Sequence, residues 1–114
     1  MIPEITVNEL AEKLKSKEKF VLLDVRELPE FSYARIEDSR LEVLPLSRLA
    51  DEGTDALPDS VTAQEMPVYV LCHHGNRSMQ VTTWLMRFDY KNVFNVHGGI
   101  DAYALQVDSS VGKY

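Results

Sequence analysis

The segment PVYVLCHHGNRS, residues 67–78, holds the features that decide the fold. Residues 67–71 are mostly apolar and contain β-branched and aromatic side chains, the composition of a strand buried on both faces. Cys72 and the polar residues after it predict a short loop, and residues 81–88 carry apolar side chains at helical spacing. Because a strand, a tight loop and a helix in this order build parallel sheets, the segment predicts an α/β domain.

Three further apolar runs predict the remaining strands. These are residues 20–25, residues 41–46, where Pro45 weakens the strand, and residues 93–96. Helical patterns separate them, and strands that alternate with helices form a mainly parallel sheet covered by helices on both faces. The expected fold class is therefore a small α/β domain of this kind.

The helices have sequence signals of their own. Thr6 and Glu9 have the spacing of a capping box, which predicts a helix over residues 7–14. Ser47 and Ser78 are expected to cap the helices that follow them. Further helical segments are expected near residues 28–31, 48–50, 79–88 and 100–105, and residues 53–63 are expected to be irregular. In the helix expected near residues 79–88, the apolar face is expected in the core and consists of Val81, Trp84, Leu85 and Phe88.

Composition limits the classes of function. The 114 residues, 45% of them hydrophobic, suit one domain that spans residues 1–114. A net charge of −6 argues against binding to nucleic acid or to an anionic membrane. The sequence shows no signal peptide and no apolar run of membrane-spanning length. A single cysteine cannot form an internal disulfide, so a cytoplasmic location is expected, and monomer is the default state.

Cys72 is the strongest candidate for chemistry. It precedes a predicted helix, whose N-terminus offers free N–H groups and a partial positive charge that stabilise a thiolate. Arg77 adds a permanent cation, and Gly75 allows the loop to curl so that its N–H groups point inward. The alternative is that Cys72 is simply a small buried apolar residue, the usual role of a lone cysteine. The residues around it favour a reactive nucleophile in an anion-binding loop.

The sequence around Cys72 resembles the active-site loop of rhodanese-like sulfurtransferase domains, whose pattern is C-x-x-G-x-R-S/T. Three further segments resemble family motifs and occur in the expected order. These are LDVRE with the EF pair (residues 23–27 and 30–31), LPLSRL (44–49) and VHGGI (96–100). Together the four motifs span most of the chain and identify it as similar to this family.

The resemblance implies a persulfide mechanism that needs no cofactor. Cys72 would take sulfur from a small donor such as thiosulfate or a persulfide and pass it to cyanide or a thiol, which includes a protein thiol. Arg77 would orient anionic donors, and the family loop corresponds to His73, His74, Gly75, Asn76, Arg77 and Ser78. By the same resemblance, Asp24 and Arg26 are expected to brace this loop through hydrogen bonds; the alternative is a solvated ion pair at the end of a strand.

The chain departs from the family pattern in two places. The family usually has G-H-I-x-G-A after its EF pair, whereas residues 34–39 read ARIEDS. This departure affects the expected wall of the adjoining pocket and therefore the donor preference. Tyr103 stands where the family often has a tryptophan.

Other functions remain open at this stage. A thiolate phosphatase or arsenate reductase would use a loop with five residues between its cysteine and arginine, and this chain has four between Cys72 and Arg77. A binding module without activity would keep the fold, although inactive relatives typically lose the cysteine. Zinc ligation by Cys72, His73, His74 and His97 is disfavoured, because adjacent histidines rarely point at one metal, so no metal site is expected.

Overall fold

The computed structural model describes residues 2–114, and in this part of the chain five strands form one parallel sheet of order β1-β5-β4-β2-β3. The prediction of a mainly parallel α/β fold is confirmed. The strands are β1 (Glu4–Ile5), β2 (Val21–Asp24), β3 (Leu41–Val43), β4 (Val68–Leu71) and β5 (Val93–Val96).

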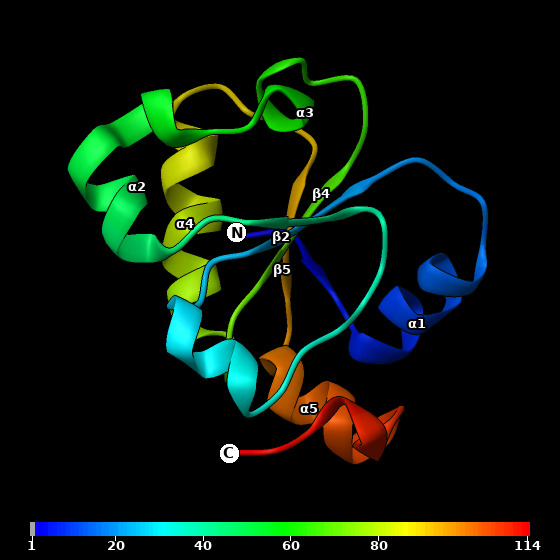
Figure 1. The fold of residues 1–114 in the computed structure, drawn as a ribbon. Helices are drawn as coiled ribbons and strands as arrows, with labels where there is room; N and C mark the ends of the chain where they lie inside the picture. Colours follow the sequence, from blue (N-terminus) through cyan, green and yellow to red (C-terminus); the bar gives the residue numbers. More distant parts are fainter. Residues whose placement is uncertain (1) are drawn as a thin grey trace.

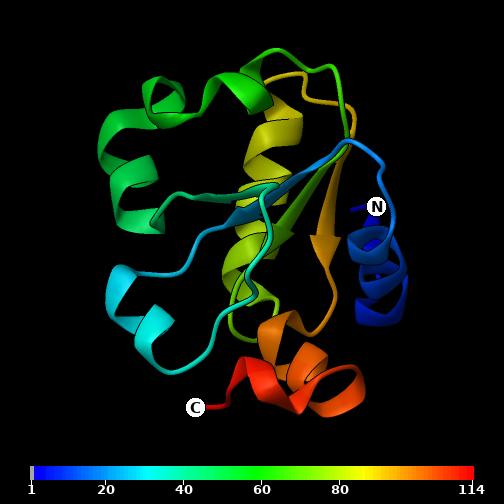
Figure 2. The same cartoon turned by 45° about the vertical axis from the view of Figure 1, so that its right-hand side comes forward.

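Helices cover both faces of the sheet, as Figures 1 and 2 show. The α-helices are α1 (Val7–Lys15), α2 (Leu46–Glu52), α3 (Asp59–Thr62), α4 (Asn76–Arg87) and α5 (Gly99–Gln106). Short 3₁₀ helices are η1 (Leu28–Ser32), η2 (Gly53–Ala56) and η3 (Ser109–Val111). Helices α1 and α5 pack on one face, and α2, α3 and α4 pack on the other. None of these helices combines the length and the apolar character that a membrane crossing requires.

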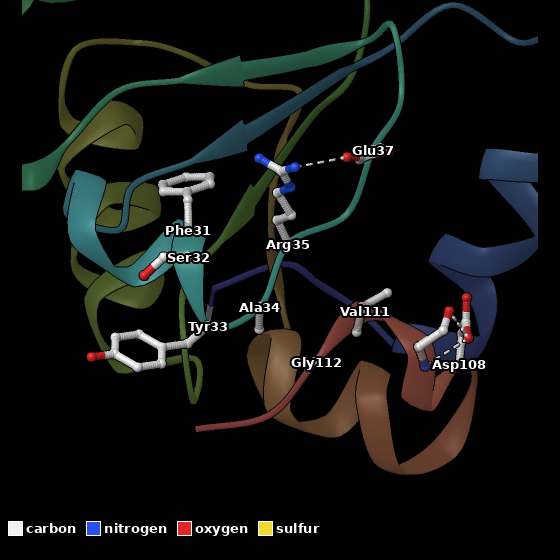
Figure 3. Close-up of a pocket in the computed structure, with 10 residues that line it drawn as sticks. Phe31, Ser32, Tyr33, Ala34, Arg35, Glu37, Asp108, Val111 and Gly112 are labelled. Atoms are coloured by element: carbon white, nitrogen blue, oxygen red, sulfur yellow. Dashed lines mark hydrogen bonds and ion pairs between the residues drawn. The ribbon is translucent and has the colours of Figure 1, made fainter.

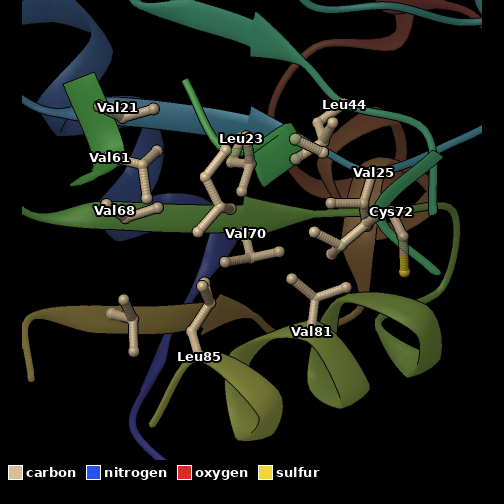
Figure 4. Close-up of a cluster of buried hydrophobic side chains, with 14 residues drawn as sticks. Val21, Leu23, Val25, Leu44, Val61, Val68, Val70, Cys72, Val81 and Leu85 are labelled. Carbon is tan, nitrogen blue, oxygen red and sulfur yellow. The ribbon is translucent and has the colours of Figure 1, made fainter. Parts of the chain in front are cut away.

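The strands send alternate side chains to two separate cores. In β4, Val68 and Val70 join the core under α2–α4, whereas Tyr69 and Leu71 join the core under α1 and α5. Cys72 continues the first series, and Figure 4 shows it at the end of this row of buried side chains. Strands β2 and β4 are buried on both faces, which explains why they are almost wholly apolar. The alternation aims Cys72 at the face that α4 covers.

Several expected elements differ in detail. Ser47 is not a cap: α2 begins at Leu46, and the N–H and hydroxyl of Ser47 donate to Glu27 instead. Residues 53–63 are not irregular, because η2 and α3 bury Ala56 and Val61 in the core. Phe88 is half exposed, because α4 ends one residue before it. Strand β1, with two residues, was not predicted, because so short a segment has no readable period.

The parallel arrangement brings the carboxyl ends of the strands to one edge of the sheet. Asp24 ends β2, Cys72 follows β4, and His97 follows β5. Ligands of open α/β sheets bind at this edge. The fold therefore places the residues singled out in the sequence in one region.

Candidate active site

The sulfur of Cys72 lies inside the curled loop that joins β4 to α4. The N–H groups of Gly75 and Ser78 donate to Sγ at 3.1 and 3.3 Å, and the Ser78 hydroxyl lies 3.2 Å from it. The Cys72 residue is 1% exposed. Two N–H donors near the start of a helix form an environment that stabilises a sulfur anion.

Gly75 gives the loop its shape. Its φ of +100° is a backbone conformation that side-chain-bearing residues rarely adopt, and it places Gly75 at the N-cap of α4. The helix therefore begins at Asn76, whose side chain is exposed. The expectation that Ser78 is the N-cap is wrong, because Ser78 is the third residue of α4 and its hydroxyl donates to Asn95. This inward position is what brings Ser78 to the sulfur.

Arg77 pairs with Glu30 across the mouth of the loop. Its two terminal nitrogens donate to the two carboxylate oxygens at 2.6 and 2.7 Å, and the Tyr114 hydroxyl donates to the same carboxylate. These bonds, that from Arg77 foremost, lower the pKa of Glu30 to about 2, and the carboxylate raises the pKa of Arg77 further. Glu30 belongs to a quoted motif, but its partnership with Arg77 was not expected. The pair presents a neutralised, rigid guanidinium beside the loop.

The two histidines of the loop have different surroundings. The His73 ring stacks on Tyr114 with centroids 3.7 Å apart, and its Nε2 lies 2.9 Å from the Tyr114 carbonyl oxygen. Burial lowers the pKa of His73 below its usual value. His74 is exposed, and its Nδ1 lies 3.7 Å from a carboxylate oxygen of Asp101.

Contrary to the expectation for adjacent histidines, ligand atoms of His73 and His74 lie close enough to share one metal ion. Ligand atoms of His73, His74 and Asp101 lie within 4.8 Å of one another. The rings of His73 and His74 lie 3.8 Å apart, centroid to centroid. Cys72 is not in this group, because its sulfur faces the N–H groups of its own loop.

Asp24 and Arg26 form a fully buried ion pair. Arg26 Nη2 lies 2.9 Å from Asp24 Oδ2, and both side chains are 0% exposed, so the alternative of a solvated pair does not hold. Arg26 also donates to the carbonyl of Ala34 and the hydroxyl of Tyr114. Within residues 2–114 neither side chain hydrogen-bonds residues 72–78, so any bracing runs through Tyr114 and Glu30.

The turn after β5 holds the cysteine loop directly. The N–H groups of Ile100 and Asp101, in the first turn of α5, donate to the carbonyls of Cys72 and His73 at 2.9 and 3.0 Å. A Cβ on Gly99 would stand 2.5 Å from both of these carbonyl oxygens. This contact gives the HGG motif, residues 97–99, its physical role.

Residues 34–37, where the family's glycine and histidine are missing, pair with the C-terminal segment. The Arg35 N–H donates to the Val111 carbonyl at 2.8 Å, and Ala34 forms a bridge with Gly112. The two segments line an open pocket of about 600 Å³, shown in Figure 3. The cysteine loop does not contribute to its lining.

Comparisons with known proteins agree with this geometry. The sequence profile of the family described as Rhodanese-like domain matches residues 6–106. The chain is 36% identical, over 99% of its length, to Rhodanese-like/PpiC domain-containing protein 12, chloroplastic, of Arabidopsis thaliana, and covers 38% of that protein. It is 32% identical, over 89% of its length, to the adenylyltransferase and sulfurtransferase UBA4 of Candida albicans, and covers 23% of it.

A solved structure shows the same fold. The rhodanese-related protein of Thermoplasma volcanium superposes with a TM-score of 0.69 at 27% identity, covering 92% of this chain and 93% of that one. The chain thus spans well under half of these two curated relatives but nearly the whole of this solved domain. With the profile matched over most of its length and Cys72 in a loop of backbone N–H donors, the chain belongs to the rhodanese-like domain family, which is homologous to sulfurtransferase and sulfur carrier domains.

Proposed function

We propose that this domain is a sulfurtransferase that carries sulfane sulfur as a persulfide on Cys72. The observation that carries the proposal is the pair of N–H groups, from Gly75 and Ser78, that donate to Cys72 Sγ. Such donors stabilise a negative charge on sulfur, which both the attacking thiolate and the persulfide anion bear.

The reaction has two displacements at sulfur. In the first, the Cys72 thiolate attacks the outer sulfur of thiosulfate, the S–S bond of the donor breaks, and sulfite leaves with the electron pair. In the second, cyanide or a thiolate attacks the outer sulfur of the persulfide. The Cys72 thiolate is then the leaving group and is regenerated. The Cys72 loop supplies the same N–H groups to both steps, and neither step needs a cofactor.

The arrangement around Arg77 supports sulfur transfer over phosphate chemistry. Its guanidinium is engaged by both oxygens of Glu30, and four residues separate it from Cys72. The Candida relative is named as a sulfurtransferase, which supports sulfur transfer as the activity of this domain. The cytoplasmic location and the monomeric state expected from the sequence stay predictions.

Intact-protein mass spectrometry tests the proposal. Reduced protein treated with thiosulfate is expected to gain one sulfur, about 32 Da, and to lose it to cyanide, whereas Cys72→Ser gains none. No gain with thiosulfate, polysulfide or a low-molecular-weight persulfide would reject the proposal. In that case, turnover of an aryl phosphate would indicate the phosphatase alternative. Equal binding of a partner protein by the natural protein and by Cys72→Ser would indicate a binding module.

A further inference from the structure

A chain of hydrogen bonds connects Cys72 to the edge of the sheet. Ser78 Oγ lies 3.2 Å from Cys72 Sγ and donates to Asn95 Oδ1. Asn95 Nδ2 in turn donates to a carboxylate oxygen of Glu4 at 2.8 Å. Ser78 and Asn95 are 0% and 1% exposed, so this polar chain is buried up to Glu4.

The register of the strands places the residues of this hydrogen-bond network next to one another. Glu4 of β1 lies directly beside Asn95 of β5, which lies beside Val70 of β4. Since side chains alternate along each strand, Asn95 and Val70 face α4, as Cys72 does two residues after Val70. Ser78 descends from the first turn of α4 onto the same face. The shortest strand, β1, therefore supplies the carboxylate of Glu4 at the end of the network farthest from Cys72.

The direction of each hydrogen bond follows from the chemistry of the groups. A carboxylate accepts only, so Glu4 requires the Nδ2 side of Asn95, and Oδ1 then faces Ser78. That oxygen takes the single hydroxyl proton of Ser78. Toward the sulfur, Ser78 can present only a lone pair, which accepts from an S–H group but opposes a sulfur anion.

We propose that Glu4 and Asn95 are positioning residues that fix the Ser78 hydroxyl as an acceptor toward Cys72 and so set the pH at which Cys72 becomes a nucleophile. The effect of this network on catalysis rests on the proposed sulfurtransferase function, because the Cys72 thiolate starts that reaction. Two N–H groups stabilise the anion, and the network withholds the third donor. The thiolate and the persulfide anion are then stabilised by these two N–H groups without a hydrogen bond from the Ser78 hydroxyl.

The variants that test the inference do not substitute the other charged residues near the site. Those that surround the Cys72 loop or face Glu4 are Arg77 with its partner Glu30, His73, His74, Asp101 and His97, whose Nδ1 lies 3.4 Å from the Glu4 carboxylate. Of these groups only His97 contacts Glu4, so Glu4→Gln removes one partner of His97, whereas Asn95→Ala leaves every one of these groups with its charged partners.

The test is the pH dependence of alkylation of Cys72, the single cysteine of the chain, by iodoacetamide. In Asn95→Ala the Ser78 hydroxyl is free to donate to the anion, and in Glu4→Gln the Asn95 amide is free to reverse. Both variants are expected to move the midpoint of the pH–rate profile down by about one pH unit, the size of one hydrogen bond to a charged group. In a Ser78→Ala background, Asn95→Ala is expected to have no further effect.

Glu65→Gln is the matched control, because it removes the same charge at the opposite end of β4 and is expected to leave the midpoint unchanged. Unchanged or higher midpoints in the two variants would overturn the inference. A shift of the midpoint in Glu4→Gln but not in Asn95→Ala would also overturn it, because the shift would then come from the lost charge of Glu4 and not from the direction of the Ser78 hydroxyl. If Asn95→Ala does not fold, Glu4→Gln is measured in the natural protein and in the Ser78→Ala background. A shift of the midpoint that is lost in the Ser78→Ala background supports the inference, and one that persists there overturns it. Alkylation needs no sulfur donor, so failure here is distinct from a failure of persulfide formation.

Discussion

The carboxylate of Glu30 accepts two hydrogen bonds, of 2.6 and 2.7 Å, from the guanidinium of Arg77, which lies 47 residues later in the chain. This pair joins η1 to the first turn of α4 and so holds the cysteine loop against the rest of the domain. The pKa of Glu30 in the folded protein is about 2, below its usual 4.5. The pair should therefore stabilise the protein above about pH 5, and this contribution should vanish as pH falls toward 2.

Glu30→Gln is expected to lose about 1–2 kcal/mol of unfolding free energy at pH 7, because a bidentate, partly buried pair exceeds an ordinary surface pair. Near pH 2 the variant and the natural protein should be equally stable. Urea denaturation from pH 2 to 7 measures both. Glu37→Gln breaks an exposed pair with Arg35 and serves as the control, with a change below about 0.5 kcal/mol. A constant gap between Glu30→Gln and the natural protein at all pH values would contradict the assignment.

Gly99→Ala tests the contact between the HGG turn and the cysteine loop. Gly99 and Gly53 have nearly the same φ, +63° and +64°, but a Cβ at Gly53 meets nothing within 4 Å. Both substitutions carry the backbone cost of a positive φ, about 1–2 kcal/mol in the left-handed helical region and more at Gly53, whose ψ of −143° lies outside that region. At Gly99 the overlap of the added methyl group with the carbonyls of Cys72 and His73 should add about 1–3 kcal/mol to the backbone cost.

Urea denaturation gives these two costs, and iodoacetamide alkylation reports the loop. Only the Gly99 variant should change the rate at Cys72, since its loop must move to admit the methyl group. An alkylation rate in Gly99→Ala equal to that in Gly53→Ala would show that the turn does not constrain the loop.

The parts of the fold that the sequence predicted are those with a strong local pattern. Residues 20–25 and 67–71 are continuous apolar runs, and their strands occur where expected. Thr6 and Glu9 form the predicted capping box through reciprocal bonds. Each of these signals is complete within a few residues, so tertiary context does not override it.

The parts that the sequence did not predict depend on partners far along the chain. Strand β1 exists because Glu4 and Ile5 pair with β5, about ninety residues later. The same distance hid the contact of Glu4 with Asn95. Ser78 has the residue type of a cap, but the positive φ of Gly75 starts α4 earlier and turns Ser78 inward. A local reading cannot weigh these contacts, because they arise only once the sheet has formed.

The ion pair of Asp24 and Arg26 is expected to matter chiefly when only one partner is lost. Both side chains are fully buried, so Arg26→Met leaves an unpaired carboxylate in the core and should cost about 3–5 kcal/mol. The double variant Asp24→Leu/Arg26→Met should recover a large part of this loss, because apolar side chains need no partner. Urea denaturation of the single and double variants measures the difference. Arg35→Met, at an exposed pair, is the control, and equal losses in the single and double variants would refute the charge argument.

The ring of Tyr114 is expected to keep His73 in its neutral form. Burial lowers the pKa of His73, and the stacked Tyr114 ring, 3.7 Å away, provides part of that burial. Tyr114→Ala keeps the backbone carbonyl that faces His73 but exposes the imidazole, so the pKa of His73 should rise toward its usual value. Tyr114→Phe keeps the ring and removes the hydroxyl bonds to Arg26 and Glu30, so the pKa of His73 should not change. A proton NMR titration of the histidine ring signals gives all three values, and equal shifts in the two variants would assign the effect to the hydroxyl. Because His73 belongs to the cysteine loop, a higher pKa of His73 would place more positive charge in this loop at a given pH.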